Sequence, residues 1–244
     1  ELDPEPGLTV VEIMDAIKAG TIKGMYILGE NPAMSDPDLT HARAALAALE
    51  HLVVQDLFVT ETAQFADVIL PAAAWSEKSG TVTNTNRQVQ MGRPALQPPR
   101  EAKPDGWVIQ EIARRFGLAW NYAGPEKVFA EMKQGMHSLD HISWSRLERE
   151  GSVTYPCSAD DAPGQDVVFS DAFPRAGGRA RFSPASPLPP DEPVDEAYPI
   201  VLTTGRLLEH WHTGAMTRRS RVLDEREPEA AAYLAPAALD RIGV

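Results

Sequence analysis

Three stretches of the sequence combine glycine with polar or charged side chains in patterns that suit ligand binding. The first is Leu28-Gly29-Glu30-Asn31-Pro32, which directly follows a short apolar run. Glycine lets a ligand approach the backbone closely, and the Asn31 amide offers both a donor and an acceptor. An ordinary turn explains the same residues, so this stretch alone leaves both interpretations open.

Polar side chains also end the next apolar run, at Gln55 and Asp56, and two more follow later, at Lys78 and Asp105. A carboxylate can accept two N–H bonds from the edge of a guanine ring, and a lysine can neutralise a phosphate. Together these groups would suit one nucleotide-shaped crevice. The alternative makes both aspartates helix or turn caps and Lys78 a solvated charge, and the spacing by itself favours that alternative.

The densest run is the third, and it ends in Gly-Ala-Met-Thr-Arg-Arg at residue 219. Its members are Thr204, Gly205, Arg206, Leu207, Leu208, Glu209, His210, Trp211, His212 and Thr213. Backbone amides, hydroxyls and a guanidinium suit a diphosphate. Zinc at the two histidines would need further ligands that the sequence does not place. A packed turn with surface histidines is the other alternative.

The elements that must position these residues alternate between helix and strand. Apolar spacing predicts helices over 10–19, from a cap at Ser35 or Asp36 to 49, over 60–65, and over 106–116 behind a cap at Asp105. Short apolar runs predict strands over 24–29, 52–54 and 68–70. In the last helix we expect Trp107, Ile109, Ile112 and Ala113 to face the core. This alternation predicts a doubly wound, mostly parallel, Rossmann-like α/β sheet, which binds ligands at the carboxyl ends of its strands.

The composition changes after residue 150. Residues 151–197 are rich in Pro, Gly, Asp and Ser, which predicts a linker, with a small hairpin formed by 167–169 and 179–182. A strand is expected over Tyr198–Thr203. We therefore divide the chain into an α/β domain over 1–150, the linker over 151–197, and the start of a second, barrel-type domain over 198–244.

Composition narrows the function. The net charge of −12 argues against a nucleic-acid surface, since phosphate binding requires clustered Lys and Arg. No apolar run approaches the roughly 20 residues of a membrane span. The single cysteine, Cys157, leaves no disulfide framework and no multi-cysteine iron–sulfur or zinc site, and favours the reducing cytoplasm. The sequence opens without Met and closes inside an apolar helical pattern, which we interpret as part of a longer protein.

The run from Gln55 to Gln90, which contains Phe-Ala-Asp-Val-Ile-Leu-Pro and Glu-Lys-Ser-Gly-Thr-Val-Thr-Asn-Thr-Asn-Arg, strongly resembles the molybdopterin oxidoreductase family. The run Thr204–Arg219 resembles the dinucleotide-binding stretch that opens that family's C-terminal barrel domain. The two runs lie in the family's order, and with residues 101–107 they extend the resemblance over nearly the whole chain. Residues 77–87 and 146–156 are most similar to formate dehydrogenase alpha subunits. Periplasmic nitrate reductase, which is similar over 204–213, and a non-catalytic nucleotide-binding module are the alternatives.

The resemblance implies a bis(molybdopterin guanine dinucleotide) cofactor that carries molybdenum or tungsten. Asn31, Gln55, Asp56, Lys78 and Asp105 match positions that hold one dinucleotide, and residues 204–213 match the loop that holds the other. Within this set we expect Asp56 or Asp105 to bind a guanine edge, and Lys78 and Arg206 to meet diphosphate oxygens.

The resemblance further implies a parent enzyme that oxidises formate to carbon dioxide and passes electrons through iron–sulfur and flavin partner subunits to NAD. The expected partners are the rest of the catalytic subunit and those electron-transfer subunits. In the family the metal is held by a Cys or selenocysteine upstream, with a His and an Arg nearby. Cys157 lies in the wrong context for that ligand. We therefore expect no catalytic and no metal-binding residue in this chain, and no activity from the chain alone.

Overall fold

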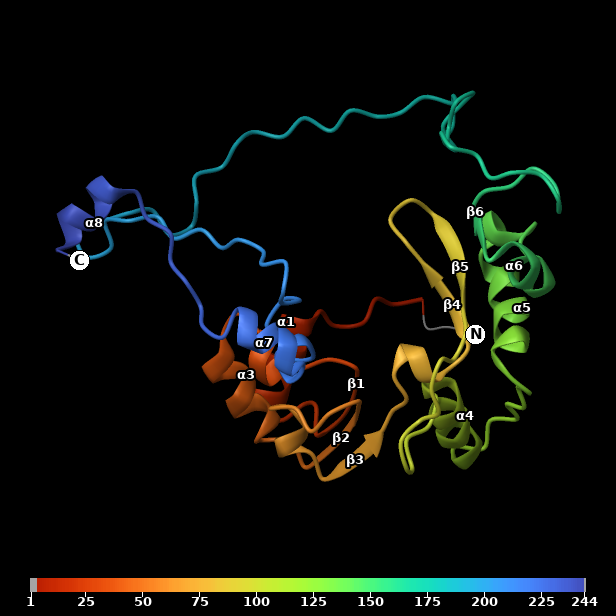
Figure 1. The fold of residues 1–244 in the computed structure, drawn as a ribbon, viewed down its shortest axis with the longest axis horizontal. Coiled ribbons are helices and arrows are strands. Elements are labelled where there is room, and N and C mark those ends of the chain that lie inside the picture. The colour runs from red at the N-terminus through yellow and green to blue at the C-terminus, as the bar shows by residue number, and fades with distance from the viewer. Residues whose placement is uncertain (1–3, 244) are drawn as a thin grey trace. The chain divides into compact units, whose positions relative to one another are not determined.

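The structure is a computed structural model that describes residues 4–243 and divides into two compact units (Figure 1). The first unit comprises the residues up to Leu70 together with those from Glu192 on, and the second comprises Pro71–Asp191. Each unit contains a sheet of its own.

A sheet with strand order β1-β2-β3 forms the centre of the first unit, from β1 (Gly24–Leu28), β2 (His51–Asp56) and β3 (Val68–Pro71). β1 runs parallel to β2, with Gly24 opposite His51 and Leu28 opposite Gln55. Because β1 and β2 are parallel, their carboxyl ends meet at one edge of the sheet. The predicted α/β class with parallel strands is confirmed.

Helix α1 (Val10–Lys18) begins at a capping box. The Thr9 hydroxyl accepts from the Glu12 backbone N–H, and the Glu12 carboxylate accepts from the Thr9 backbone N–H at 2.7 Å. Its inward residues Met14 and Ile17 are buried in a cluster with two alanines of helix α3 (Leu39–Leu46). This is the helical face that the apolar spacing predicted.

The helix predicted from Ser35 or Asp36 is wrong at its start. Two helices occupy the region, α2 (Pro32–Ser35) and α3, and Asp38 caps the second by accepting from the His41 backbone N–H at 3.0 Å. Asp36 is extended, with ψ of 136°. Pro37 explains this, because proline disfavours helical geometry in the residue before it.

The second unit contains an antiparallel sheet that the sequence analysis did not predict. Its strands are β4 (Gly80–Thr83), β5 (Gln88–Gly92) and β6 (Ser152–Thr154), in that order. Its helices are α4 (Asp105–Arg115), α5 (Pro125–Gly135) and α6 (Trp144–Glu150). The buried core members are Val89, Phe129, Leu139, Ile142, Leu147, Val153 and Cys157. The strands are short and mostly half-buried, so they lack the apolar run that marks a strand in sequence.

The predicted inward face of α4 is wrong in part. Trp107 is 49% exposed and Ile109 is also exposed, whereas Val108, Gln110 and Ala113 are buried. The Gln110 side-chain oxygen accepts from the backbone N–H of Tyr122 at 2.5 Å, which gives this polar residue a reason to face inward. Asp105 is not the cap either. Pro104 occupies that position, and Asp105 is in the first turn, where its negative charge is favourable.

The strand-like runs after residue 160 form no strand in the described part of the chain. Residues 167–169 and 179–182 do not pair; instead the Phe173 backbone N–H donates to the Gly178 carbonyl and closes a turn. Tyr198–Thr203 is also irregular, and Leu202 is 87% exposed. A strand needs a neighbouring strand to bond its backbone, and no strand is placed beside this run within residues 4–243. The described residues 4–243 contain no closed barrel.

The remaining elements are short. They are the 3-10 helices Ala63–Phe65 (η1), Trp75–Glu77 (η2), His137–Leu139 (η3) and Thr217–Arg219 (η4), and the helices α7 (Arg221–Arg226) and α8 (Pro236–Ile242). No helix within residues 4–243 is both long and apolar enough to span a lipid bilayer.

Candidate cofactor-binding residues

The turn after β1 needs glycine for its backbone conformation. Gly29 has φ of +65°, and nothing lies within 4 Å of the position a Cβ would take. Its backbone N–H donates to the Gln55 carbonyl at 2.9 Å, so the turn begins directly at the edge of the sheet. A left-handed φ favours glycine. The open space beside it is consistent with the predicted close approach of a ligand.

Asn31 joins the loop after β1 to the loop after β2. Its side chain is 7% exposed. The side-chain oxygen accepts from the backbone N–H of Thr62 at 3.1 Å and from the Thr62 hydroxyl at 2.8 Å, while the amide nitrogen donates to Glu61 at 2.8 Å. The donor and acceptor noted in the sequence are thus used within the protein, and Asn31 shapes this edge of the sheet.

Glu61 is held ionised by that arrangement. The hydrogen bond from Asn31, a bond to its own backbone N–H, and the charges of Arg219 and Arg43 lower the pKa of the Glu61 carboxyl, against an opposing effect of burial. The carboxyl edge of the first sheet therefore carries a fixed negative charge beside the backbone of the two loops.

Gln55 and Asp56 lie at the end of β2, as predicted. Gln55 is fully buried, and its side-chain oxygen accepts from the Tyr26 hydroxyl. Asp56 is half-buried, and one of its oxygens accepts from the backbone N–H of Leu57 at 2.6 Å. Of these two residues, Asp56 is the one whose position lets it reach a ligand.

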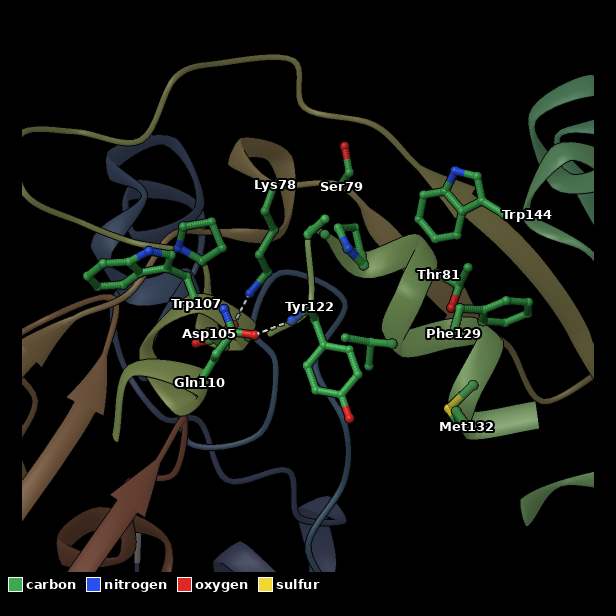
Figure 2. Close-up of a pocket in the computed structure, with 16 residues that line it drawn as sticks. Lys78, Ser79, Thr81, Asp105, Trp107, Gln110, Tyr122, Phe129, Met132 and Trp144 are labelled. Atoms are coloured by element: carbon green, nitrogen blue, oxygen red, sulfur yellow. Dashed lines mark hydrogen bonds and ion pairs between the residues drawn. The ribbon is translucent and has the colours of Figure 1, made fainter. Parts of the chain in front are cut away.

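Lys78 and Asp105 form an ion pair in the second unit, although they are 27 positions apart in the chain. Lys78 directly follows η2 and Asp105 begins α4. Their side chains are 28% and 27% exposed, and both line a cavity of about 410 Å³. Figure 2 shows the ammonium directed at the carboxylate, with Phe129 and Trp144 on another side of the cavity.

Most of the cavity wall is apolar or aromatic. Beside the ion pair it is lined by Trp107, Tyr122, Val128, Phe129, Met132 and Trp144. Flat walls and one charged corner suit a planar heterocycle, because the rings pack on its faces while a carboxylate accepts its N–H groups and an ammonium donates to its carbonyl oxygen. A pterin or a guanine has that chemistry, so the residues present fit the group that the sequence implied.

The run Thr204–Thr213 lies in the first unit, and its buried member is His210, which is 6% exposed. One ring nitrogen donates to the Glu227 carbonyl at 2.8 Å, and the other lies 3.3 Å from the Thr217 hydroxyl. That hydroxyl also accepts from the backbone N–H of Trp211 at 3.1 Å. His210 therefore holds the run in place and is not directed at a ligand.

Most other members of the run are exposed, among them Arg206 and His212. An Arg206 guanidinium nitrogen lies 3.2 Å from a ring nitrogen of His212, and His212 has φ of +51°. The Trp211 ring meets His212 edge-on, with the ring centres 4.9 Å apart. Arg206 remains accessible to an anion. Within residues 4–243 no group of three or more His, Cys, Asp or Glu side chains is arranged to hold a metal ion, so the zinc alternative gains no support.

Sequence reasoning missed the residues that connect these stretches. Glu61 and Thr62 were not singled out, and Arg219 was noted only as the end of the run Thr204–Arg219. Of the aromatic residues of the cavity only Trp107 was named, and it was expected in the core. The partners of Glu61, Thr62 and Arg219 are 30 or more positions away, so local spacing carries no trace of the contacts. The available signal was the Thr-Arg-Arg run at 217–219, where two adjacent guanidinium groups follow the predicted diphosphate loop.

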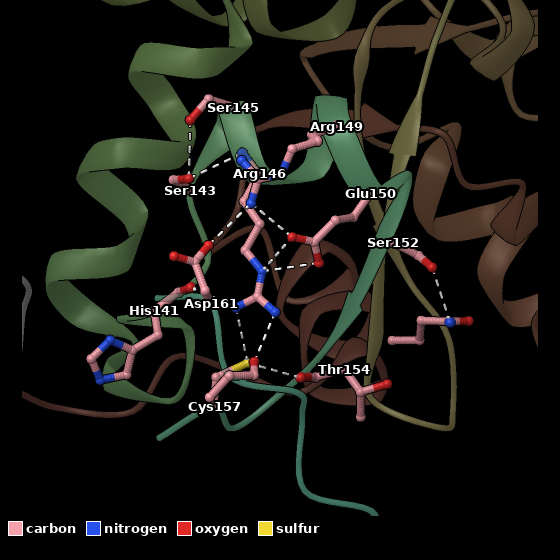
Figure 3. A network of polar contacts seen from close by, with 12 residues as sticks. His141, Ser143, Ser145, Arg146, Arg149, Glu150, Ser152, Thr154, Cys157 and Asp161 are labelled. Carbon is pink, nitrogen blue, oxygen red and sulfur yellow. Dashed lines mark hydrogen bonds and ion pairs between the residues drawn. The ribbon is translucent and has the colours of Figure 1, made fainter. Parts of the chain in front are cut away.

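A second polar network lies around Arg146, whose guanidinium is buried (Figure 3). It contacts Glu150 at 3.1 Å and donates to the carbonyls of His141 at 3.2 Å and Ala162 at 2.8 Å. The Cys157 thiol lies 3.7 Å away and donates to the Thr154 carbonyl at 3.2 Å. The network fastens α6 to the loop that follows β6, and Cys157 fills space within it.

Comparison with known proteins supports the resemblance seen in the sequence. Residues 1–115 match the molybdopterin oxidoreductase family. The F420-dependent formate dehydrogenase subunit alpha of Methanocaldococcus jannaschii is 43% identical over 227 residues, which are 92% of this chain and 33% of that protein. The assimilatory nitrate reductase catalytic subunit of Bacillus subtilis is 36% identical over 241 residues, or 96% of this chain and 34% of that protein.

A solved structure agrees on the fold. Acetylene hydratase from Pelobacter acetylenicus superposes with a TM-score of 0.66 at 19% identity, over 96% of this chain and 34% of that chain. The chain spans about a third of the length of the curated formate dehydrogenases it matches, at 33%, 32% and 36%. The resemblance seen in the sequence is confirmed: residues 1–115 match the molybdopterin oxidoreductase family, and the chain is similar to formate dehydrogenase alpha subunits over nearly its whole length.

Proposed function

We propose that this chain is the part of a formate dehydrogenase catalytic subunit that holds portions of a bis(molybdopterin guanine dinucleotide) cofactor. The observation that carries the proposal is the aromatic cavity with the Lys78–Asp105 pair at its corner. The family implies a molybdopterin cofactor, and relatives named formate dehydrogenase subunit alpha are 36–43% identical to this chain.

The residues of this chain bind and orient. When bound, the cofactor with its molybdenum or tungsten supplies the redox chemistry that oxidises formate to carbon dioxide. Asp105 accepts N–H groups of a ring held between the aromatic walls, and those walls exclude water. Lys78 neutralises the negative charge of diphosphate oxygens, while Asp56, at the end of β2, accepts N–H groups of a guanine edge. Arg206 and the backbone amides of residues 204–213 hold a diphosphate.

The remaining machinery lies outside this chain. In this proposal the iron–sulfur clusters belong to other parts of the enzyme, and flavin and iron–sulfur subunits carry electrons to NAD in the cytoplasm. Relatives named F420-dependent make F420 the competing acceptor. Reduction of NAD, and not of F420, by formate in the isolated complex would support the NAD assignment, and the opposite result would overturn it.

The second candidate is a molybdenum reductase of the nitrate reductase type. It is favoured by the 36% identity to the assimilatory nitrate reductase catalytic subunit. Dye reduction by formate, compared with dye oxidation by nitrate, separates the two activities in the protein that carries this chain. Binding of a guanine nucleotide with neither activity would instead indicate a non-catalytic module.

The cofactor assignment is tested by replacing Asp56→Ala in the protein that carries this chain. We expect the molybdenum or tungsten content and the pterin content per chain to fall together, because the residue at the end of β2 no longer binds. Asp171→Ala, at an exposed position in the second unit, is the matched control and should retain both. Unchanged metal and pterin in the Asp56 variant would contradict its assigned role.

A further inference from the structure

Arg219 connects two parts of the first unit that are 160 residues apart in the chain. It ends the 3-10 helix η4, and its Nε donates to the Ala215 carbonyl at 3.0 Å. One of its terminal nitrogens donates to the Val59 carbonyl at 3.3 Å, and its guanidinium carbon lies 4.9 Å from the centre of the Phe58 ring. One planar cation thus contacts both its own segment and the loop after β2.

The loop that receives Arg219 is itself well fixed. It begins directly after Asp56, and the Thr60 backbone N–H donates to the Phe58 carbonyl at 3.0 Å. Two residues further on, Thr62 is fully buried and bonded to Asn31. Arg219 is therefore attached to a loop that cannot shift without disturbing the carboxyl edge of the sheet.

On its own side, Arg219 lies close to the run Thr204–Thr213. Thr217, two residues earlier in the same 3-10 helix, accepts from the Trp211 backbone N–H at 3.1 Å and contacts His210. The chain of contacts runs from Phe58 and Val59 through Arg219 and Thr217 to Trp211. It links two of the stretches that the sequence assigned to cofactor binding in this unit, the one that ends at Asp56 and the run Thr204–Thr213.

We propose that Arg219 is a positioning residue, which fixes the run Thr204–Thr213 against the loop after Asp56 before the cofactor binds. This inference rests on the proposed function, since it assigns a purpose to the link only if both stretches hold the cofactor. Preorganisation of this kind strengthens binding, because the loop does not have to be ordered by the ligand.

The adjacent Arg218 has a different role. Its terminal nitrogen donates to Asp224 at 3.2 Å and to the Pro228 carbonyl at 3.1 Å, all within its own segment. A Cβ on Gly214 would come within 2.7 Å of the Arg218 side chain, and Gly214 has φ of +74°. Arg218 and Gly214 shape the segment, whereas Arg219 attaches it to the sheet.

The experiment compares Arg219→Ala, Arg219→Lys and the control Arg221→Ala. Arg221 is exposed and contacts Glu225 within its own helix, so its replacement removes the same charge from the same segment. The first measurement is hydrogen exchange of the backbone amides of residues 204–217 in the protein that carries this chain, after removal of the cofactor. We expect exchange about tenfold faster in the Arg219→Ala variant, from the loss of two charge-assisted bonds and one cation–π contact.

The exchange rate of the Arg219→Lys variant should lie between those of wild type and Arg219→Ala, since an ammonium still attracts the Phe58 ring but cannot also bond both carbonyls. The second measurement is the pterin and metal content of each purified protein, which should decrease in the same order. Phe58→Leu is a milder variant of the same contact, and we expect about threefold faster exchange there. It serves if Arg219→Ala does not fold.

Unchanged exchange at 204–217 in both the Arg219→Ala and Phe58→Leu variants would overturn the inference. Equal acceleration in Arg221→Ala would also overturn it, because the effect would then come from net charge. Wild-type protein without any pterin dinucleotide would instead refute the proposed function. That result is seen in the unmutated protein, so the two failures are distinguishable.

Discussion

Asn31 in the first unit and the Lys78–Asp105 pair in the second are polar groups of the kind that hold ligands, yet the two units use them differently. Asn31 is almost fully buried, and both ends of its amide are bonded to the neighbouring loop. The ion pair is more than a quarter exposed and lines an open cavity. A polar side chain that faces a cavity is thus a stronger ligand candidate than one whose groups are already bonded within the protein.

The energetics of the two arrangements differ in the same sense. Buried hydrogen bonds are expensive to leave unmade, at roughly 1–3 kcal/mol for each orphaned group. A partly exposed ion pair contributes only about 0–1 kcal/mol, because water competes for both charges. Lys78 and Asp105 can therefore exchange each other for a ligand at little cost, whereas Asn31 cannot leave Thr62. Four substitutions test this contrast.

The largest effect is expected for Asn31→Ala. It leaves the buried Thr62 N–H and hydroxyl without their acceptor, so we expect a loss of about 3 kcal/mol in the free energy of unfolding. Urea denaturation measures it. Asn121→Ala, at an exposed position where the side chain accepts a hydrogen bond from Arg114, should change stability by less than about 0.5 kcal/mol. Equal losses in the two variants would remove the contrast between buried and exposed amides.

Asp105→Asn should show the reverse pattern. Stability should change by less than about 1 kcal/mol, because the pair is partly exposed. Cofactor affinity should fall by about tenfold, since a neutral amide accepts fewer N–H bonds than a carboxylate. Thermal unfolding and pterin content measure the two quantities separately. A large destabilisation with full cofactor content would make the pair structural, like Asn31.

Glu61→Gln sharpens the comparison through pH. The hydrogen bond from Asn31 first, then the bond to its own backbone and the nearby arginines, lowers the pKa of Glu61 below its ordinary 4.5, so the folded state favours the carboxylate. Because the pKa of Glu61 is lower in the folded protein than in the unfolded chain, its carboxylate stabilises the folded state at pH values above the pKa of the unfolded chain. That stabilisation is lost as the pH falls through the pKa of the folded protein. We expect wild type to exceed the Gln variant by up to about 1 kcal/mol at pH 7.

That difference should shrink as the pH falls below about 4.5. Urea denaturation at a series of pH values between neutral and acid measures it. The exposed Glu229→Gln serves as the control and should follow the wild-type curve. A difference that stays constant across the series would show that Glu61 stabilises the loop by shape and not by charge.

The smallest effect is expected for Lys103→Gln. The Lys103 ammonium lies 5.7 Å from the centre of the Trp107 ring, which is half exposed at the edge of the cavity. We expect a loss of less than about 0.5 kcal/mol in stability, and unchanged pterin content. Tryptophan fluorescence during denaturation reports on both the ring and unfolding. A clear loss of pterin would extend the binding site outward from the Lys78–Asp105 pair.

Local pattern determined a good part of the fold. The Thr9 capping box, the spacing of Met14 and Ile17, and the apolar run of β1 each depend on residues within one turn or one strand. Such signals can be read without knowledge of neighbours, since helix and strand place side chains with fixed periods. The same reasoning correctly placed Gln55 and Asp56 at the end of β2.

Local sequence pattern predicted the structure wrongly where contacts with distant residues determine it. Tyr198–Thr203 has the composition of a strand and remains irregular, because a strand requires a partner. α4 turns Gln110 inward and leaves Trp107 outward, because the backbone of Tyr122 offers a bond at that position. The β4–β6 sheet was not predicted, because its strands are too short and too polar to show the apolar run that marks a strand in sequence.

The sequence by itself indicated the resemblance to one family, predicted the parallel sheet and supplied the short list of polar residues that we propose to hold a cofactor. Only the tertiary structure decided which partner each residue contacts. Lys78 pairs with Asp105 beside a cavity, Asn31 accepts a hydrogen bond from Thr62, and Arg219 donates one to Val59. The physical reason is distance along the chain. A hydrogen bond acts over about 3 Å in space. The local spacing of residues does not indicate which residue, dozens of positions away in the chain, will be its partner.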